Sequence, residues 1–376
     1  MTATPHAARE EARALLALLA AAPRPAGGPA EAAVRARCAS TLRALGFDVE
    51  ERPFGYSALP GRFGTSIGGV LSIAALVVAS LLGARGERGG ALAVLAGTGA
   101  LLLFGGAWLA RRGVLDAPWL RATGVNLEAR RGGEAPRVWL VAHLDSKSQP
   151  VSIGLRAAGV TGTIAAWALA LLALLQPAGA TSSAIWIAVG AIGALAGLPV
   201  AASVVGALSP GALDDASGVA TVLLAAARLP TDAEVGVLLT SAEELGLAGA
   251  RAWIAEGRVP PGVALNCDGV DDVGGATCMY TRRRPARLMA AVATAARAIG
   301  APPPYPRRLP PGILTDGVAL ADAGWEVVTV SRGTLRTLAR IHGPKDRVER
   351  LTGVGVAETA RLLAAAAGEL AGAGRG

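Results

Sequence analysis

Residues 137–146 read RVWLVAHLDS, and this stretch decides the fold. Its run Val138–Ala142 is continuously apolar, which is typical of a strand buried on both faces of a parallel sheet. The same pattern returns in three later runs, Val235–Leu239, Val263–Leu265 and Val327–Val330. Helical patterns lie between these runs, at Ala216–Leu229 and Arg287–Ile299. Strands that alternate with helices predict an α/β fold with a mostly parallel sheet flanked by helices.

The N-terminal part of the chain extends this pattern. Pro29–Leu45 places apolar residues on roughly one helical face, and Phe47–Pro53 and Val125–Arg130 alternate like strands. The short apolar stretch Ala14–Ala22 follows a mixture of basic and acidic side chains, which is unlike a signal peptide. The first residues therefore predict an amphipathic helix.

The hydrophobic residues are concentrated in blocks. Hydrophobic residues make up 52% of the 376 positions and charged residues only 17%. Four blocks contain no charged residue: Gly64–Ala84, Gly89–Ala110, Ala157–Gln176 and Thr181–Leu208. Each has about the 20 residues that a helix needs to cross a bilayer. The blocks therefore predict four transmembrane helices, arranged as two hairpins.

The two hairpins define the predicted domain organisation. Residues 64–112 form the first hairpin and residues 156–208 form the second. A hairpin returns the chain to the side of the membrane that it left, so the residues outside the hairpins can fold together. Segments 1–63, 113–155 and 209–376 are therefore predicted to form one domain.

The charge and cysteine content argue against two classes of protein. The net charge is +8, but the basic residues are scattered, and the longest run, Arg282–Arg284, has no aromatic motif beside it. Nucleic-acid binding is therefore not predicted. Cys38, Cys267 and Cys278 have unrelated spacings, so they form no disulfide framework and suit a reducing compartment.

Side chains that can bind metal ions follow the buried strands and one helix start. They are His143 and Asp145, Asp214 and Asp215, Glu243 and Glu244, Asp268, and His342 and Asp346. In an open parallel sheet, sites form at the carboxyl ends of the strands. Histidines together with carboxylates are ligands for Zn²⁺ or a similar divalent ion. Two such ions need a bridging carboxylate and can clamp a hydrolytic transition state.

Neighbouring residues in this set can have different roles, such as metal binding, orientation of a ligand and proton transfer. Asp145 is placed to fix the tautomer of a metal-binding His143. Glu243 and Glu244 point in different directions, so one can bind metal while the other accepts a proton from metal-bound water. Each feature alone has an ordinary structural reading, because acidic residues also cap helices or lie on solvated faces. Their recurrence at strand ends favours one joint site.

With these motifs the chain resembles metallopeptidase family twenty-eight, of the bacterial leucyl aminopeptidase and aminopeptidase Y type. The matching stretches are AHLDS (142–146), LDDASGVA (213–220), TSAEELGLAGAR (240–251), NCDGV (266–270), LTDG (314–317) and IHGPKD (341–346). The resemblance implies the zinc-exopeptidase fold, of the phosphorylase/hydrolase-like type. It also implies hydrolysis of N-terminal peptide bonds in a peptide or aminoacyl substrate.

The resemblance further implies a role for each matching residue. His143 and His342 would each be a terminal ligand of one of two zinc ions per chain. Asp214 would bridge both ions, and Glu244 and Asp268 would each ligate one of them.

The remaining matching residues would support the chemistry. Glu243 would be the general base and then the acid that protonates the leaving amine, and Asp145 would orient His143. An unusual cis peptide bond is expected before Asp215. Asp316 matches an Asp that often lines the site in this family, and its role is left open.

The hairpins depart from the family's pattern. The second hairpin separates the His-Leu-Asp motif from the Asp-Asp motif, which family members join by a short loop. This arrangement predicts a bilayer near the rim of the active site and favours membrane-associated or hydrophobic substrates. Cations flank the hairpins on the domain side at Arg62, Arg111, Arg112, Arg121, Lys147 and Arg156, whereas the opposite loops hold only Arg85 and Arg88. The positive-inside rule then predicts an integral protein of a bacterial plasma membrane with a cytoplasmic catalytic domain.

Two other functions are compatible with parts of the pattern. The motif HLDSK (143–147) resembles that of glutaminyl cyclases, which share the fold but use one zinc ion and an acyl-transfer reaction. A catalytically inactive membrane scaffold or receptor is a second alternative. The intact Asp-Asp-Ala-Ser-Gly and Ala-Glu-Glu-Leu-Gly segments favour the peptidase, and the metal content discriminates the three. The sequence carries no signal for an oligomeric state.

Overall fold

The computed structural model of the chain describes residues 4–133, 135–310 and 312–372. Two compact units are present. The sheet unit consists of Met1–Tyr56, Arg121–Ser148 and Ala207–Gly376, and the helical unit consists of Ser57–Leu120 and Gln149–Gly206. The predicted segments 1–63 and 209–376 begin and end with residues 1–3 and 373–376, which lie outside the described residues.

The two segments of the helical unit have slightly different bounds from the two predicted hairpins. Residues that flank the first predicted hairpin bond to one another. The hydroxyl group of Ser57 donates to the carbonyl oxygen of Trp119 at 2.6 Å, and the amide of Ala58 donates to the carbonyl of Leu120 at 2.9 Å. These bonds assign the flanking residues to the helical unit.

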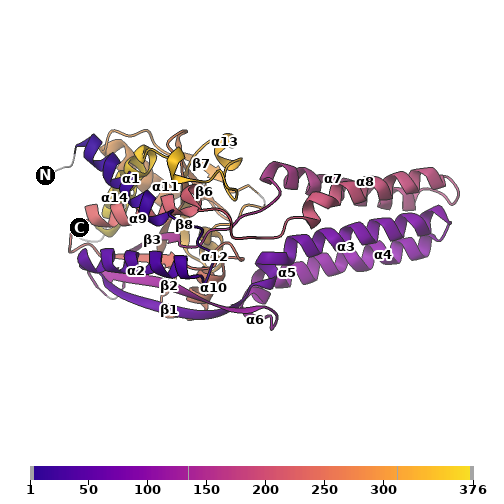
Figure 1. Cartoon of the computed structure of the whole chain (residues 1–376), viewed down its shortest axis with the longest axis horizontal. Coiled ribbons are helices and arrows are strands. Elements are labelled where there is room, and N and C mark those ends of the chain that lie inside the picture. Colours follow the sequence, from indigo (N-terminus) through magenta and orange to yellow (C-terminus); the bar gives the residue numbers. More distant parts are fainter. Residues whose placement is uncertain (1–3, 134, 311, 373–376) are drawn as a thin grey trace. The chain divides into compact units, whose positions relative to one another are not determined.

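The sheet unit is built on one eight-stranded sheet with the order β1-β2-β4-β3-β5-β8-β6-β7 (Figure 1). Its strands are β1 Asp48–Ser57, β2 Arg121–Arg131, β3 Val138–His143, β4 Val235–Thr240, β5 Val263–Val270, β6 Ala276–Tyr280, β7 Tyr305–Arg308 and β8 Glu326–Arg332. The central strands β4, β3, β5 and β8 are parallel, whereas β2 and β6 join them antiparallel. The predicted α/β fold is confirmed, and its sheet is mixed.

The continuous apolar runs are explained by burial on both faces of the sheet. All six residues of β3 and all six of β4 are buried. In β3, Leu140 and Ala142 pack into the main core, whereas Trp139 and Val141 pack into a second cluster with Trp253 and Trp325. Each face is therefore covered, as a mainly parallel sheet requires.

The last two strands of the sheet were not predicted from the sequence. β6 follows a Gly-rich turn, and β7 is a short edge strand whose four residues are all exposed. Pro306 lies in β7, where it pairs with β6 at the edge of the sheet. A strand without a buried face has no apolar alternation, and an edge strand is one of the few places in a sheet that tolerate proline.

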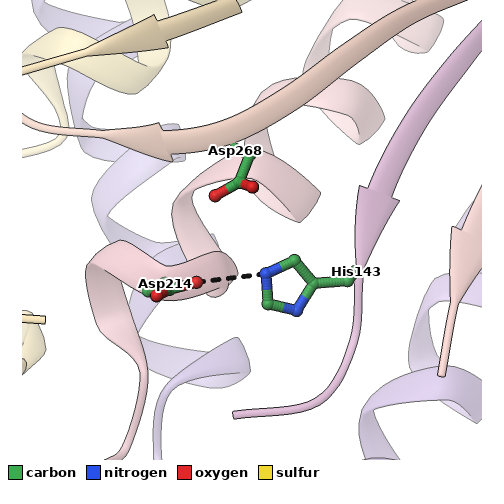
Figure 2. Close-up of side chains that lie close together, drawn as sticks. All are labelled: His143, Asp214 and Asp268. Atoms are coloured by element: carbon green, nitrogen blue, oxygen red, sulfur yellow. Dashed lines mark hydrogen bonds and ion pairs between the residues drawn. The ribbon is translucent and has the colours of Figure 1, made fainter. Parts of the chain in front are cut away.

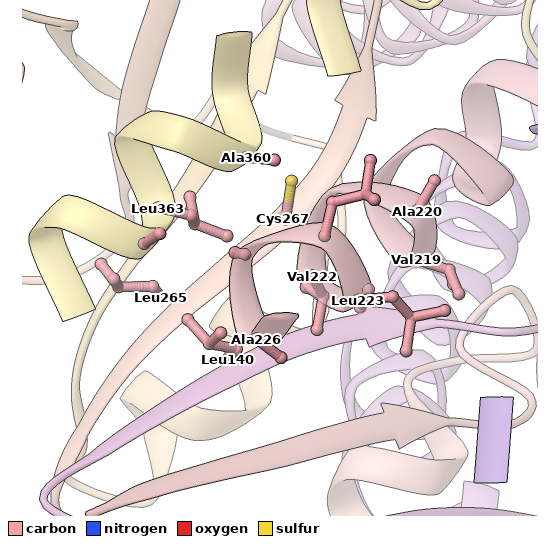
Figure 3. Close-up of a cluster of buried hydrophobic side chains, with 14 of the residues drawn as sticks. Leu140, Val219, Ala220, Val222, Leu223, Ala226, Leu265, Cys267, Ala360 and Leu363 are labelled. Atoms are coloured by element: carbon pink, nitrogen blue, oxygen red, sulfur yellow. The ribbon is translucent and has the colours of Figure 1, made fainter. Parts of the chain in front are cut away.

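Helices cover both faces of the sheet. They are α1 Pro5–Leu19, α2 Pro29–Ala44, α9 Ser217–Arg228, α10 Ala248–Ala255, α11 Ala286–Ala298, α12 Asp316–Asp322, α13 Leu335–Leu338 and α14 Val354–Gly372. α9 is the most central, because every residue from Ser217 to Ala226 is buried. Figure 3 shows its Val222 and Leu223 near Leu140 of β3 and Leu363 of α14. The start of this buried helix carries the Asp-Asp motif.

The helical unit contains four helices that are long and apolar enough to cross a membrane. They are α3 Leu59–Ala84, a rod over Arg88–Asp116, α7 Ile153–Leu175 and α8 Ser183–Ala201. The rod consists of α4 Arg88–Ala100, η1 Leu101–Gly105, α5 Gly106–Trp108, η2 Leu109–Gly113 and α6 Val114–Asp116. Each of these helices overlaps one of the charge-free blocks.

The fourth helix is shorter than the predicted block Thr181–Leu208, and that part of the prediction is wrong. α8 ends at Ala201, and the hydroxyl group of Ser203 bonds to the carbonyl oxygen of Pro199 at 2.7 Å. The residues that follow are Val204, Val205 and Gly206, which are poor helix formers. Hydropathy alone does not register this ending, because valine and glycine keep the block apolar.

Small residues allow α3 and α8 to approach closely. A Cβ atom on Gly69 of α3 would lie 2.4 Å from the backbone nitrogen of Ala201, and one on Gly193 of α8 would lie 2.6 Å from Leu76 Cδ1. Close packing of small residues is the usual way in which membrane helices associate. By contrast, Leu103 and Phe104 of the rod are 72% and 77% exposed.

The close contact between β3 and β4 predicts the effect of one substitution. A Cβ atom on Gly236 would lie 2.5 Å from the indole ring of Trp139 on the neighbouring strand. Gly236→Ala is expected to lower the free energy of unfolding by about 1–3 kcal/mol, because an overpacked core must shift. Gly275→Ala is the matched control, since no described atom lies within 4 Å of its added Cβ. Denaturant unfolding followed by tryptophan fluorescence measures both, and equal stability of the two variants would refute the argument.

Candidate metal centre

The predicted site residues gather at the carboxyl edge of the central strands. His143 is the last residue of β3, Asp268 lies near the end of β5, and Glu243 and Glu244 follow β4. Asp214 lies in η3 Ala212–Ala216, the segment directly before α9. His342 and Asp145 complete the set from the loops that follow α13 and β3. The structure therefore brings together all of the residues that the sequence singled out.

Two groups of these side chains can each hold a metal ion. The first is His143, Asp214 and Asp268, and the second is Asp214, Glu244 and His342. Within each group the possible ligand atoms lie within 4.8 Å of one another. Figure 2 shows the imidazole of His143 directed at Asp214, with the carboxylate of Asp268 facing the same space. Asp214 belongs to both groups.

The carboxylate of Asp214 is divided between the two histidines. Its Oδ1 lies 3.1 Å from His143 Nε2, and its Oδ2 lies 2.8 Å from His342 Nε2. Glu244 Oε1 lies 3.4 Å from the same nitrogen of His342. One oxygen toward each group is the arrangement that a bridging carboxylate needs.

Asp215 belongs to neither group and instead joins three elements of the site through backbone amides. The peptide bond between Asp214 and Asp215 is cis, as the family resemblance implies. The carboxylate of Asp215 accepts hydrogen bonds from the backbone amides of His143 at 3.3 Å, Gly218 at 2.9 Å and Gly269 at 3.1 Å. These bonds join β3, α9 and β5 through one buried side chain.

Asp145 has a second role besides the predicted one. Its Oδ1 lies 3.5 Å from His143 Nδ1, and its backbone carbonyl is closer, at 3.1 Å. Its carboxylate also accepts from the backbone amides of Glu243 at 3.1 Å and Glu244 at 3.2 Å. Asp145 therefore lies where it can orient the histidine and also fixes the turn that carries both glutamates.

Two residues support the site in ways that the sequence did not predict. Asp346 accepts from the backbone amides of Leu213 at 2.6 Å and Asp214 at 3.3 Å, which ties the His342 loop to the Asp-Asp segment. Its motif was noted, but a carboxylate that binds backbone amides has no distinctive sequence pattern.

The other such residue is Arg24, which is only 1% exposed. Its guanidinium group donates to the carbonyl oxygens of Leu144 at 2.8 Å, Pro210 at 2.6 Å and Gly211 at 3.0 Å. These carbonyls lie just after His143 and just before Asp214. Arg24 thus holds two ligand-bearing segments, and nothing in a lone arginine between two prolines predicts such a role.

The buried charges of the site are strongly unbalanced. Burial, together with nearby Glu244, raises the pKa of Glu243 well above its usual range, although His143 opposes the shift. Burial and the charge of Asp214 raise the pKa of Asp268 to about 7. Burial alone would lower the pKa of His143, but the charge of Glu243 and hydrogen bonds that the imidazole donates to Asp145 and Asp214 raise it well above its usual value. The site therefore favours bound cations.

The chemistry of the donor set fits a divalent metal ion. Imidazole nitrogens and carboxylate oxygens are zinc ligands. Among the described residues, Glu244 Oε1, His342 Nδ1 and Asp316 Oδ1 are buried without a hydrogen-bond partner. The other oxygen of Asp316 accepts a hydrogen bond from the Thr240 hydroxyl. An unpartnered buried carboxylate oxygen of Glu244 beside His342 is the group that a metal ion would satisfy.

Lys147 lies at the site. From the sequence it was predicted to be one of the cations that flank the hairpins on the domain side, and its contact with Glu244 corrects that prediction. Its Nζ contacts Glu244 Oε2, and its side chain is only 17% exposed. A basic residue next to a predicted membrane segment need not face the membrane surface, because its nearest partner can come from a distant part of the chain.

Fold and site together define an α/β protein with a candidate metal centre at the carboxyl edge of its sheet. Residues 197–367 match the model of Peptidase family M28, the family that the motifs indicated. No curated protein matches the chain.

Solved structures share the fold. The aminopeptidase from Aneurinibacillus sp. strain AM-1 superposes with a TM-score of 0.55 at 15% identity, covering 96% of this chain and 93% of its own. BSAP, a zinc aminopeptidase from Bacillus subtilis, gives a TM-score of 0.54 at 15% identity, with 95% and 94% covered. The Fimbriiglobus ruber glutaminyl cyclase gives 0.54 at 14% identity, with 97% and 95% covered. The match to the peptidase family model supports a hydrolase, and the solved structures show the shared fold.

Glu31 of α2 lies behind the site and predicts a pH dependence of stability. It is fully buried, and its Oε2 accepts from the amide of Gly27 at 2.6 Å. Burial, with the nearby charge of Asp145, raises its pKa from 4.5 to about 7. Between pH 4.5 and 7 the folded state keeps a proton that the unfolded state has lost, so stability falls as the pH rises. The fall levels off above pH 7.

The substitution Glu31→Gln removes this titration and keeps the shape of the side chain. Across the pH range 4.5–7 the wild type is expected to lose about 3 kcal/mol of unfolding free energy relative to the variant. Denaturant unfolding of both metal-free proteins at several pH values measures the difference. A difference that does not change with pH would show that Glu31 titrates normally.

Proposed function

We propose that the protein is a zinc-dependent aminopeptidase that holds two metal ions per chain and hydrolyses the peptide bond after an N-terminal residue. The observation that carries this proposal is the divided carboxylate of Asp214, with one oxygen toward His143 and the other toward His342. Membership of residues 197–367 in the matched peptidase family supports the same reaction class.

The two groups of side chains supply the ligands in this proposal. His143, Asp214 and Asp268 would hold one ion, and Asp214, Glu244 and His342 would hold the other. Bound zinc ions polarise a scissile carbonyl and lower the pKa of an attacking water molecule. The buried carboxylates compensate the charge of the ions.

Glu243 is the general base of the proposed reaction. Its Oε2 lies 3.9 Å from His143 Nε2, so the carboxylate borders the first group without belonging to it. A raised pKa suits a group that first accepts a proton from water and then returns it to the leaving amine. Asp145, which binds the backbone amide of Glu243, keeps this carboxylate in place.

A glutaminyl cyclase-like acyl transfer is the second candidate function. It is favoured by Lys147 in the HLDSK motif and by the folds of the Fimbriiglobus ruber and Macrostomum lignano glutaminyl cyclases. One zinc ion per chain, with conversion of an N-terminal glutamine to a cyclic product, would support it. Two zinc ions with release of free amino acids would support the aminopeptidase.

We further propose that the helical unit spans the plasma membrane of a bacterium as two hairpins, with the sheet unit in the cytoplasm. Without Lys147, five cations remain on the predicted domain side: Arg62, Arg111, Arg112, Arg121 and Arg156. The opposite loops hold Arg85 and Arg88, and Arg88 donates to the carbonyl oxygen of Pro177 at 3.1 Å. The positive-inside rule therefore still favours a cytoplasmic sheet unit. Membrane-associated or hydrophobic peptides are the proposed substrates.

Substitutions at the site separate the base from the ligands. Glu243→Gln is expected to lower kcat by roughly 10²–10⁴-fold, because the variant cannot accept the proton, while the zinc content stays the same. His143→Ala and His342→Ala are the comparison variants, and each is expected to lose zinc. Elemental analysis of detergent-purified protein and hydrolysis of aminoacyl amides measure both properties. Unchanged turnover in Glu243→Gln would disprove its role, and a wild type that binds no zinc would favour the inactive scaffold.

The orientation of the sheet unit can be measured in cells. Protease added to intact spheroplasts is expected to leave the sheet unit uncut, and the same protease is expected to digest it after lysis. A periplasmic protein of the same strain controls for access of the protease. Digestion in intact spheroplasts would place the sheet unit outside the cytoplasm.

A further inference from the structure

Lys147 is one of only two lysines in the chain, the other being Lys345. Its Nζ contacts Glu244 Oε2, and the two side chains are 17% and 5% exposed. Lys147 comes from the loop after β3, and Glu244 comes from the turn after β4. The contact therefore joins two elements that carry candidate ligands.

The two carboxylate oxygens of Glu244 face different partners. Oε2 contacts Lys147, whereas Oε1 lies 3.4 Å from His342 Nε2 and has no hydrogen-bond partner in the described chain. Oε1 is therefore the oxygen available to an ion held with Asp214 and His342. The ammonium group occupies the other oxygen.

The backbone on both sides of Lys147 is fixed. The amide of Ser146 donates to the carbonyl oxygen of Arg24 at 2.8 Å, and the hydroxyl group of Ser146 donates to the carbonyl oxygen of Ser209 at 2.9 Å. Ser148 Oγ accepts from the amide of Leu208 at 2.9 Å. Because both neighbours are held, the backbone of Lys147 is already ordered. Placing its long side chain against Glu244 then costs side-chain entropy alone.

We propose that Lys147 is a positioning residue that holds Glu244 through Oε2 and turns Oε1 toward the Asp214–His342 position. Glu244 would then offer a metal ion one oxygen, Oε1. The inference rests on the proposed function, because it takes Glu244 as a metal ligand. It assigns Lys147 to one of the two metal positions, since its contact is with a member of the second group and not with Asp268 of the first.

Two physical effects of Lys147 on a bound ion oppose each other. The positive ammonium group repels a divalent ion, so its removal would tighten binding. Its hydrogen bond orients the ligand, and loss of such an outer partner typically weakens metal affinity by about 10–100-fold. The orienting effect dominates in our proposal, because the ammonium group contacts the oxygen that faces away from the ion.

The test compares zinc binding of Lys147→Met and the wild type. Metal-free full-length protein in detergent is titrated with zinc in competition with a chelator. The variant is expected to bind one zinc ion as tightly as the wild type and the other about 10–100-fold more weakly. Lys147→Gln, which keeps a hydrogen-bond donor but loses the charge, is expected to lie between them. Lys345→Met, at an exposed lysine, is the control and is expected to match the wild type.

Cobalt substitution gives a readout that does not depend on affinity. The visible spectrum of Co²⁺ reports the geometry of its ligands. In Lys147→Met, Glu244 is free to bind with both oxygens, so the spectrum of the cobalt-loaded protein is expected to change, whereas that of Lys345→Met is not.

The outcomes separate this inference from the proposed function. If the wild type binds two zinc ions and Lys147→Met binds both at least as tightly with an unchanged cobalt spectrum, the positioning role is overturned. If the wild type binds no zinc, the proposed function itself fails.

Discussion

The site depends on the sharing of one buried carboxylate between two histidines. Asp214 can face both His143 and His342 only because its backbone is held on each side. Asp346 binds its amide, and Asp215, the next residue, binds amides of three other elements. Moving this segment would separate the two groups of ligand atoms, since Asp214 is their only common member.

The carboxylates around this segment fall into two classes by their partners. Asp145, Asp215 and Asp346 accept hydrogen bonds from backbone amides, which stabilises their charge and uses them to join chain segments. In the described residues, Asp214 and Glu244 face histidines or Lys147 instead. A buried carboxylate without amide donors needs a cation or a proton. The proposed metal ligands are thus the carboxylates that the backbone leaves unsatisfied.

The sequence could predict the features that local patterns encode, but not those that depend on contacts between distant residues. The buried strands and the motifs at their ends were recognisable because hydropathy and local spacing encode them. The roles of Arg24 and Asp346 were not predicted, because they arise from hydrogen bonds to residues more than a hundred positions away. Lys147 was assigned to a membrane flank because its partner, Glu244, also lies in a distant part of the chain. The exposed strand β7 and the end of α8 were missed because neither changes the local hydropathy pattern.

The same long-range bonds account for a site that tolerates a large insertion. The segment Gln149–Gly206 separates His143 from Asp214 in the sequence, and a flexible connection of that length would weaken their alignment. The ends of the insertion are closed inside the sheet unit, where Ser146 and Ser148 bond to Ser209 and Leu208. Arg24 reinforces this closure by binding carbonyls on both sides of it. The insertion therefore holds His143 and Asp214 as close together as a short loop would, and this does not depend on what the inserted helices contact.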